Sequence, residues 1–417
     1  LKKSAFFDLH ANQIVPSPDG KPTTIARLWF KSADRSAYER VVFDPSGKAD
    51  ENALNLWRGF PIIPKEGDWS LLRDHIEENV CLGDKTEYKW LLAWIAQIFQ
   101  VPEKKLGSAV VIGGEKGTGK SKLAEWLSFL LKQYAKTVSQ AQHVTGNFNA
   151  HMEQCLLLVA EEAFWAGSKQ DEGALKHLIT GKTITLERKG IDPVQIDNFT
   201  RLLVISNNDW IVPATVDERR FFVLKISSKH QRDTKYFAAI DEQMKNGGAE
   251  AMLHDLLELD ISNVDLRNPP KTQWLIDQIE EGLSDVQAWI REMLLEGCLP
   301  HHDEKDYWGS RVSTQGYIMN DSKITVIDTG IVYESFVNFC RITRFHKPAC
   351  KAKFGREIKR IIPELNKTRV KENGKRVYKY EFPSLSEVVG DFCSYTGIYL
   401  FDEIDRASCK PIIRLPI

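Results

Sequence analysis

The sequence has 417 residues, a formal net charge of -1 and 42% hydrophobic residues, values typical of soluble globular proteins. The chain is too long for a single domain of ordinary size, because domains average roughly 150 residues. We therefore expect two or three domains. No run of about 18 consecutive apolar residues occurs, which excludes a membrane-spanning protein. The seven cysteines follow no repeated spacing, which argues against a disulfide framework and favours a reducing, cytoplasmic compartment.

The N-terminal segment, residues 1–85, combines short apolar alternations with turn clusters and then a helical pattern at 69–80. Because Leu1 rather than Met opens the chain, we expect this sequence to be part of a longer protein. Apolar residues at helical spacing predict a further helix over 85–100. We expect this helix to lead into a compact nucleotide-binding unit at 86–265.

Four short apolar runs, typical of strands buried on both faces, mark the central region. These runs are residues 108–113, 155–162, 199–208 and 220–227. Helical patterns separate some of them, including "SKLAEWLSFLLKQYA" after the first run. Strands alternating with helices predict an α/β fold with a largely parallel sheet.

A glycine-rich loop joins the first strand to this helix. Its sequence "GEKGTGKS" matches G-x-x-x-x-G-K-[ST], the phosphate-binding loop of P-loop NTPases. We expect the nucleotide to be bound by Gly114, Glu115, Lys116, Gly117, Thr118, Gly119, Lys120 and Ser121. In such a loop the backbone N–H groups surround phosphate oxygens, and the helix N-terminus adds its positive dipole. Lys120 is expected to reach the β- and γ-phosphates of ATP, and the Ser121 hydroxyl to bind Mg²⁺.

The second strand ends in two adjacent glutamates, Glu161 and Glu162. A phosphate loop needs an acidic element that binds the metal and a base that activates the attacking water. We assign Glu161 to the metal and Glu162 to the water, and the two roles are exchangeable at this point.

The third strand ends in Asn207 and Asn208, and Arg219 and Arg220 precede the fourth. An amide at a strand tip can position the attacking water, although asparagine also commonly starts a turn. An arginine can stabilise charge in the transition state, whereas adjacent surface arginines are more often only solvated.

The C-terminal region, expected at 271–417 after a linker at 266–273, is basic. Between residues 341 and 380 there are 14 lysines and arginines against three glutamates, a local charge of +11. Helical patterns at 331–345 and 349–365 precede a hairpin signal at Asn373-Gly374. This order outlines a winged helix, and we expect its second helix to bind DNA through Lys351, Lys353, Arg356 and Lys359. The alternative is a charged protein-interaction module.

Together these motifs resemble the ATPase core of the superfamily 3 helicases. The resemblance rests on "GGEKGTGKS", "EEAFWAG", "LKHLITGKTITLERKG" and "ISNNDWIVPATVDERRFF", and it covers most of residues 50–260. It is strongest to the primase–helicases of phages and plasmids, which are similar to the poxvirus primase–helicase.

The resemblance implies an AAA+-type P-loop NTPase core, usually a hexameric ring, with ATP and Mg²⁺ held between subunits. Lys120, Ser121, Glu161 and Glu162 fall on its two Walker motifs. Asn207, or Asn208, falls on the sensor position, and Arg219 or Arg220 on the arginine finger that acts on the neighbour's ATP.

In this family a hairpin carries a basic residue into the central channel to hold single-stranded DNA. Residues 183–196 match it here, with Lys189 the first candidate and Arg188 the second. One departure is that the metal carboxylate, often Asp in the family, is Glu161. A primase–polymerase domain commonly precedes such a core, and we expect it in the longer protein.

The expected function is therefore an ATP-dependent DNA helicase from the replication protein of a phage or mobile element, working in the cytoplasm of a bacterial host. The alternative is an origin-binding initiator, in which ATP controls assembly and little unwinding occurs. Glu162 and an arginine finger favour turnover, because binding alone needs neither.

Overall fold

The computed structural model describes residues 3–140, 142–146, 149–162, 169–208, 211, 219–299, 319, 324–343, 348–372, 374–396 and 398, and the side chains of these residues except 169–172 and 191. The chain divides into two units, Leu1–Pro61 and Ile62–Ile417. Among the described residues no helix is long and apolar enough to cross a bilayer.

The first unit contains short elements and little core. Its elements are α1 (Lys3–Leu9), β1 (Ile14–Pro16), β2 (Pro22–Thr24), α2 (Ile25–Lys31), β3 (Arg40–Val42) and β4 (Ala53–Asn55). Strands β1 and β2 pair antiparallel, and β3 and β4 pair parallel. Rings of α1 contact rings of α2, with centroids 5.5 Å apart for Phe6 and Trp29.

The second unit is built on a five-stranded sheet in which all strands are parallel. Its order is β11 (Phe221–Lys225), β5 (Ala109–Gly113), β10 (Arg201–Ser206), β7 (Leu157–Glu161) and β6 (Ala135–Val138). Every residue of β5 and β10 is buried, because helices cover both faces of the sheet. The four expected strands and the parallel sheet are confirmed.

Strand β6 replaces the end of a helix that the sequence pattern extends to residue 135. Helix α5 (Lys120–Leu131) stops earlier, because Lys132 has a φ of 45° and a 3₁₀ turn, Lys132–Tyr134, follows. The expected helical end at Tyr134 and Ala135 is therefore wrong. At the sheet edge β6 is only half-buried, so it lacks the apolar run that marks the other strands.

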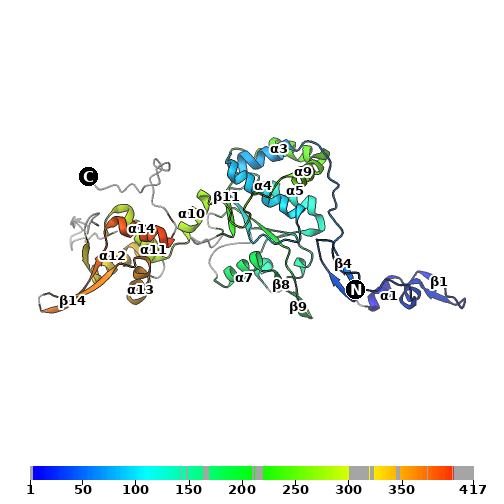
Figure 1. Ribbon diagram of the computed structural model, residues 1–417, viewed down its shortest axis with the longest axis horizontal. Helices are drawn as coiled ribbons and strands as arrows, with labels where there is room; N and C mark the ends of the chain where they lie inside the picture. The colour runs from blue at the N-terminus through cyan, green and yellow to red at the C-terminus, as the bar shows by residue number, and fades with distance from the viewer. Residues whose placement is uncertain are drawn as a thin grey trace. The chain divides into compact units, whose positions relative to one another are not determined.

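Helices α4 (Lys85–Gln100) and α9 (Ala249–Glu258) pack together above the strands in Figure 1. The expected helix at 85–100 is confirmed, with Asp84 as its N-cap, accepting from the N–H groups of Thr86 and Glu87. Helix α3 (Ser70–Asp74) continues as a π-helical turn, His75–Val80, and packs on α8 (Thr234–Gln243). Although α3 precedes residue 85, it is part of the larger unit.

Helix α7 (Lys169–Thr180) and the antiparallel hairpin of β8 (Thr183–Arg188) and β9 (Ile191–Asp197) lie below the strands in Figure 1. The expected hairpin is thus confirmed. Two short helices, α6 (Gln142–Thr145) and a 3₁₀ turn at Ala150–Met152, precede β7. A π-helical turn, Met244–Gly248, joins α8 to α9.

Helix α10 (Gln273–Glu281) packs on the sheet, where Trp274 lies against Gly113. The remaining elements are α11 (Asp285–Glu296), β12 (Thr325–Asp328), α12 (Thr329–Ile342), α13 (Lys351–Ile361), β13 (Asn366–Glu372), β14 (Lys375–Phe382) and α14 (Leu385–Thr396). Their antiparallel sheet has the order β12-β14-β13. The two expected helices and the hairpin of this region are confirmed, although α13 ends at Ile361 rather than at residue 365.

Candidate functional site

The glycine loop between β5 and α5 is held in left-handed backbone conformations, with φ of 80° at Gly117 and 90° at Gly119. Gly119 is the N-cap of α5, so the N–H groups of the first helical turn have no intrahelical partner. A Cβ on Gly119 would lie 2.4 Å from a ring carbon of Phe237 and 2.9 Å from one of His75. The loop therefore requires glycine for packing as well as for its backbone angle.

Replacing Gly119 with alanine is expected to destabilise the protein, because a left-handed residue costs about 1–3 kcal/mol and the new methyl group clashes. Thermal unfolding measures the change. Gly173→Ala is the matched control, since an added Cβ there meets nothing within 4 Å in helix α7, and it is expected to stabilise by roughly 0.5–1 kcal/mol. Equal effects of both variants would contradict the packing role of Gly119.

Lys120, the first residue of α5, directs its ammonium group into the loop and is only 6% exposed. Its Nζ donates to the carbonyls of Gly114 (2.7 Å) and Glu115 (2.6 Å) and to Oδ1 of Asn207 (2.8 Å). Burial lowers the pKa of Lys120, and the charges of Glu162 and Glu115 oppose that shift. The ammonium group is thus positioned by acceptors that phosphate oxygens can replace.

Strand order brings Asn207 and Glu162 to Lys120. Because β10 lies between β5 and β7, the carboxyl ends of all three strands meet at one edge. The carboxylate of Glu162 accepts hydrogen bonds from the backbone N–H (3.2 Å) and the side-chain amide of Asn207. Glu162 itself has a left-handed φ of 52°, and its N–H donates to the carbonyl of Ile205 (2.9 Å). Asn207 thus connects Lys120 to Glu162.

A pocket of about 410 Å³ opens over this edge and is lined by Lys120, Ser121, Glu161, Glu162 and Asn207. Asn208 does not line it. Mg²⁺ binds one or two carboxylates together with phosphate oxygens and water rather than a dedicated protein cage. Among the described residues no group of three histidine, cysteine, aspartate or glutamate side chains forms such a cage. Ser121 and Glu161 on one wall therefore fit a nucleotide-bound Mg²⁺.

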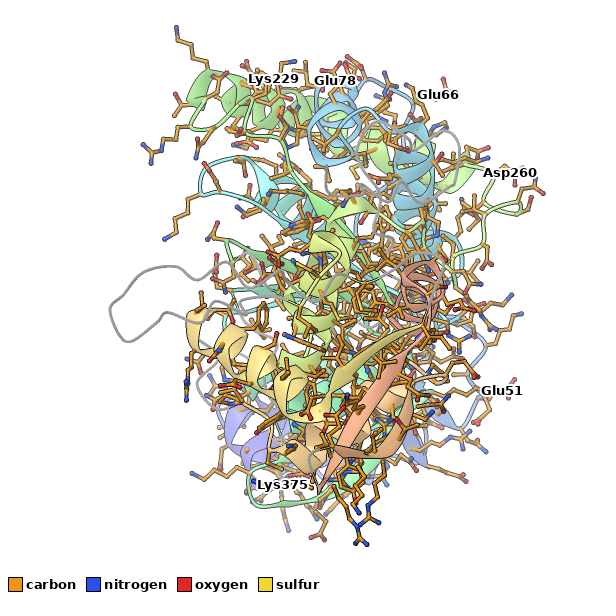
Figure 2. The ribbon with its side chains drawn as sticks, turned by 90° about the vertical axis from the view of Figure 1, so that its left-hand side faces the viewer. Glu51, Glu66, Glu78, Lys229, Asp260 and Lys375 are labelled. Atoms are coloured by element: carbon orange, nitrogen blue, oxygen red, sulfur yellow. The ribbon has the colours of Figure 1, made fainter. Side chains whose placement is uncertain are left out.

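A further wall comes from residues that no sequence motif marks: Arg232, Thr234 and Phe237, at the start of α8. The backbone N–H of Arg232, a residue with φ of 60°, donates to the carbonyl of Gly117 (2.8 Å). The segment before α8 is also held by an ion pair between Lys229 and Glu78 (3.7 Å; Figure 2). Only tertiary packing brings this wall to the loop.

His75 supports the loop from behind and is fully buried. Its Nε2 lies 3.3 Å from the carbonyl oxygen of Gly119, and its Nδ1 lies 3.2 Å from the hydroxyl of Tyr236. Burial lowers the pKa of His75 to about 4, so the ring is neutral at neutral pH. A neutral ring adds no positive charge behind the glycine loop.

Arg219 and Arg220 lie away from this pocket. They immediately precede β11, whose first residue pairs with Ala109, the first residue of β5. The glycine loop follows the last residue of β5. The length of this five-residue strand, roughly 16 Å, therefore separates the arginines from the loop. One chain therefore does not bring these arginines to its own phosphate loop.

The tip of the β8–β9 hairpin carries Arg188 and Lys189. Arg188 forms an ion pair with Glu153 at 2.5 Å, whereas Lys189 lies exposed in the turn. Of the motif stretches named above, residues 163–168, 209–210 and 212–218 lie outside the described residues.

On α13 all four expected DNA-binding residues are exposed, while Phe354, Ile358 and Ile361 face the core. Lys359 donates to the carbonyl of Leu365 (2.7 Å), in the segment that follows the helix. The ammonium of Lys351 lies 5.8 Å from the centre of the Tyr333 ring. Figure 2 shows Lys375 at the end of the β13–β14 hairpin, where nitrogen-bearing side chains gather.

Comparison with known proteins identifies distant relatives. A profile described as a family of unknown function (DUF5906) matches residues 111–220. The DNA primase-polymerase of Nitratiruptor phage NrS-1 is 23% identical over 339 residues, which cover 70% of this chain and 47% of that protein. This chain thus spans about half of the relative's length.

Two apo structures of the NrS-1 C-terminal region superpose with TM-scores of 0.64 and 0.63 at 16% identity. Each alignment covers 91% of this chain and 98% of the solved chain. The chain therefore shares the fold of that region and is a distant relative of a phage DNA primase-polymerase.

Proposed function

We propose that this chain is the ATP-driven motor of a phage or mobile-element replication protein, an AAA+-type ATPase of the superfamily 3 helicase kind. In this proposal six copies of the chain form a ring that unwinds DNA. The observation that carries the proposal is the chain of contacts Lys120–Asn207–Glu162 beside a pocket that also contains Ser121 and Glu161. Binding alone does not need a carboxylate held next to the phosphate loop.

In this proposal the loop N–H groups and Lys120 bind the phosphates of ATP, and Lys120 exchanges two loop carbonyls for phosphate oxygens. Ser121 and Glu161 hold Mg²⁺, which neutralises phosphate charge. Glu162 accepts the proton of the attacking water, and Asn207 fixes the orientation of its carboxylate. Arg219 or Arg220 serves the pocket of the neighbouring subunit, because neither reaches its own.

DNA binding is assigned to two places. The order α11–β12–α12–α13–β13–β14 is that of a winged helix, with the cations of α13 exposed for duplex or forked DNA. The β8–β9 hairpin is assigned to single-stranded DNA in the ring channel. The distant relationship to a phage primase-polymerase supports a replication role in a bacterial cytoplasm, beside a fused or associated primase–polymerase.

The test is ATP hydrolysis with and without single-stranded DNA, together with separation of a forked duplex. We expect DNA-stimulated turnover and strand separation, both abolished by Lys120→Ala. Lys235→Ala is the matched control, because this exposed lysine of α8 does not line the pocket, and it is expected to behave as wild type. ATP binding without turnover, unaffected by DNA, would instead support the ATP-regulated initiator.

A further inference from the structure

A second cavity, of about 620 Å³, lies between the 3₁₀ turn Ala150–Met152 and the end of the β8–β9 hairpin. It is lined by Ala150, His151, Glu187, Arg188 and Lys189. None of these residues lines the nucleotide pocket. The cavity thus combines two cations of the hairpin with a histidine from a different part of the chain.

The two walls of this cavity are fixed to each other. The side chain of Asn149 donates to the carbonyl of Thr185 (2.8 Å) and accepts from the N–H of Glu187 (2.9 Å). At the other end of the same segment Glu153 pairs with Arg188 at 2.5 Å. Residues 149–153 are therefore attached to β8 at both ends, which gives the cavity a defined geometry.

Among the described residues, one of the two ring nitrogens of His151 makes no hydrogen bond. Its Nε2 is buried and, in the part of the chain that the structure describes, makes no hydrogen bond. The other nitrogen bonds to the backbone of His143, a contact that favours the protonated ring. A buried polar atom without a partner costs about 1–3 kcal/mol, and His151 lines the cavity, so a ligand that reaches this nitrogen gains a hydrogen bond that the free protein lacks.

We propose that this cavity binds a backbone phosphate of single-stranded DNA, with the Nε2–H of His151 and the ammonium of Lys189 as donors. Arg188 is then a positioning residue, because its guanidinium holds the hairpin to Glu153. The inference rests on the proposed function in one respect, the hairpin as a DNA-binding element. It adds a second segment of the chain and a histidine to that element.

Phosphate binding by His151 requires a proton. In the free protein burial is the largest cause of the lowered pKa of His151, and His143 and Lys136 lower it further. The other charged side chains at or next to the cavity are Arg188, Lys189, Glu187 and Glu153. A bound phosphate raises this pKa, so the complex takes up a proton. Affinity for DNA therefore increases as the pH falls and levels off below the pKa of the free ring.

The experiment measures binding of a fluorescent oligothymidylate to the whole chain by anisotropy, without nucleotide, from about pH 8 to about pH 6. We expect the wild-type affinity to increase on acidification, by at most about tenfold per pH unit for one proton. His151→Gln is expected to lose this increase. His254→Gln is the control, because His254 lies beside Asp255 on α9, and it should keep the increase.

Glu153→Gln provides a test that leaves His151 in place. This substitution breaks the ion pair that holds Arg188. If Arg188 only positions the hairpin, DNA binding becomes weaker. If Arg188 contacts DNA itself, loss of its carboxylate partner makes DNA binding tighter. Thermal unfolding confirms that each variant is folded. DNA binding with a pH dependence unchanged by His151→Gln would overturn this inference alone. A wild-type chain that binds no DNA would overturn the proposed function as well.

Discussion

Glu162→Gln is expected to lower the rate of ATP hydrolysis by about 10²–10⁴-fold, the usual contribution of a general base, while ATP binding is retained. Glutamine keeps the size and the hydrogen-bonding oxygen of Glu162, so the contact with the Asn207 amide survives. It cannot accept the proton of the attacking water. Single-turnover hydrolysis and equilibrium binding of a fluorescent ATP analogue measure the two effects separately.

Glu161→Gln is the comparison for this prediction, because both glutamates line the pocket but only Glu162 contacts Asn207. We expect Glu161→Gln to raise the Mg²⁺ concentration needed for half-maximal hydrolysis, and Glu162→Gln to leave it unchanged. The reverse pattern would show that the two roles are exchanged.

The glycine loop between β5 and α5 could be predicted from the sequence because all its parts are contiguous. Gly114 to Ser121 form one segment between a buried strand and a helix, so local pattern alone specifies their arrangement. The position of Glu162 and Asn207 beside this loop needed one further step, the order of the parallel strands, since β10 separates β5 from β7. That strand order follows from tertiary packing, and the local sequence around Glu162 or Asn207 does not specify it.

The residues that pack against the glycine loop could not be predicted. His75 lies in a π-helical turn and Phe237 in α8, 162 residues later in the chain, and both meet Gly119 only in the folded protein. The backbone of Arg232 adopts a left-handed φ that no local signal in "SSKHQRDT" requires. Strand β6 was missed for a related reason, because an edge strand needs fewer apolar residues than a central one.

A mixture of two inactive variants is expected to recover ATP hydrolysis if the arginine finger acts between subunits. One variant is Lys120→Ala, and the other replaces both Arg219 and Arg220 with alanine. Each alone is expected to lose turnover, the second by about 10³–10⁵-fold. In an equal mixture about a quarter of the interfaces combine an intact loop with an intact finger from the neighbour in a ring, and these interfaces hydrolyse ATP.

The geometry of the sheet is the reason for expecting recovery. The arginines precede β11 at one edge, and the phosphate loop follows β5 at the other, so complementation within one chain is not possible. Single variants then identify the finger. Arg219 is exposed and Arg220 is half-buried, so we expect Arg219→Ala to account for most of the loss, because a finger must extend beyond its own subunit. A mixture that stays inactive, although mixed rings form, would place the function of these arginines within their own subunit's fold.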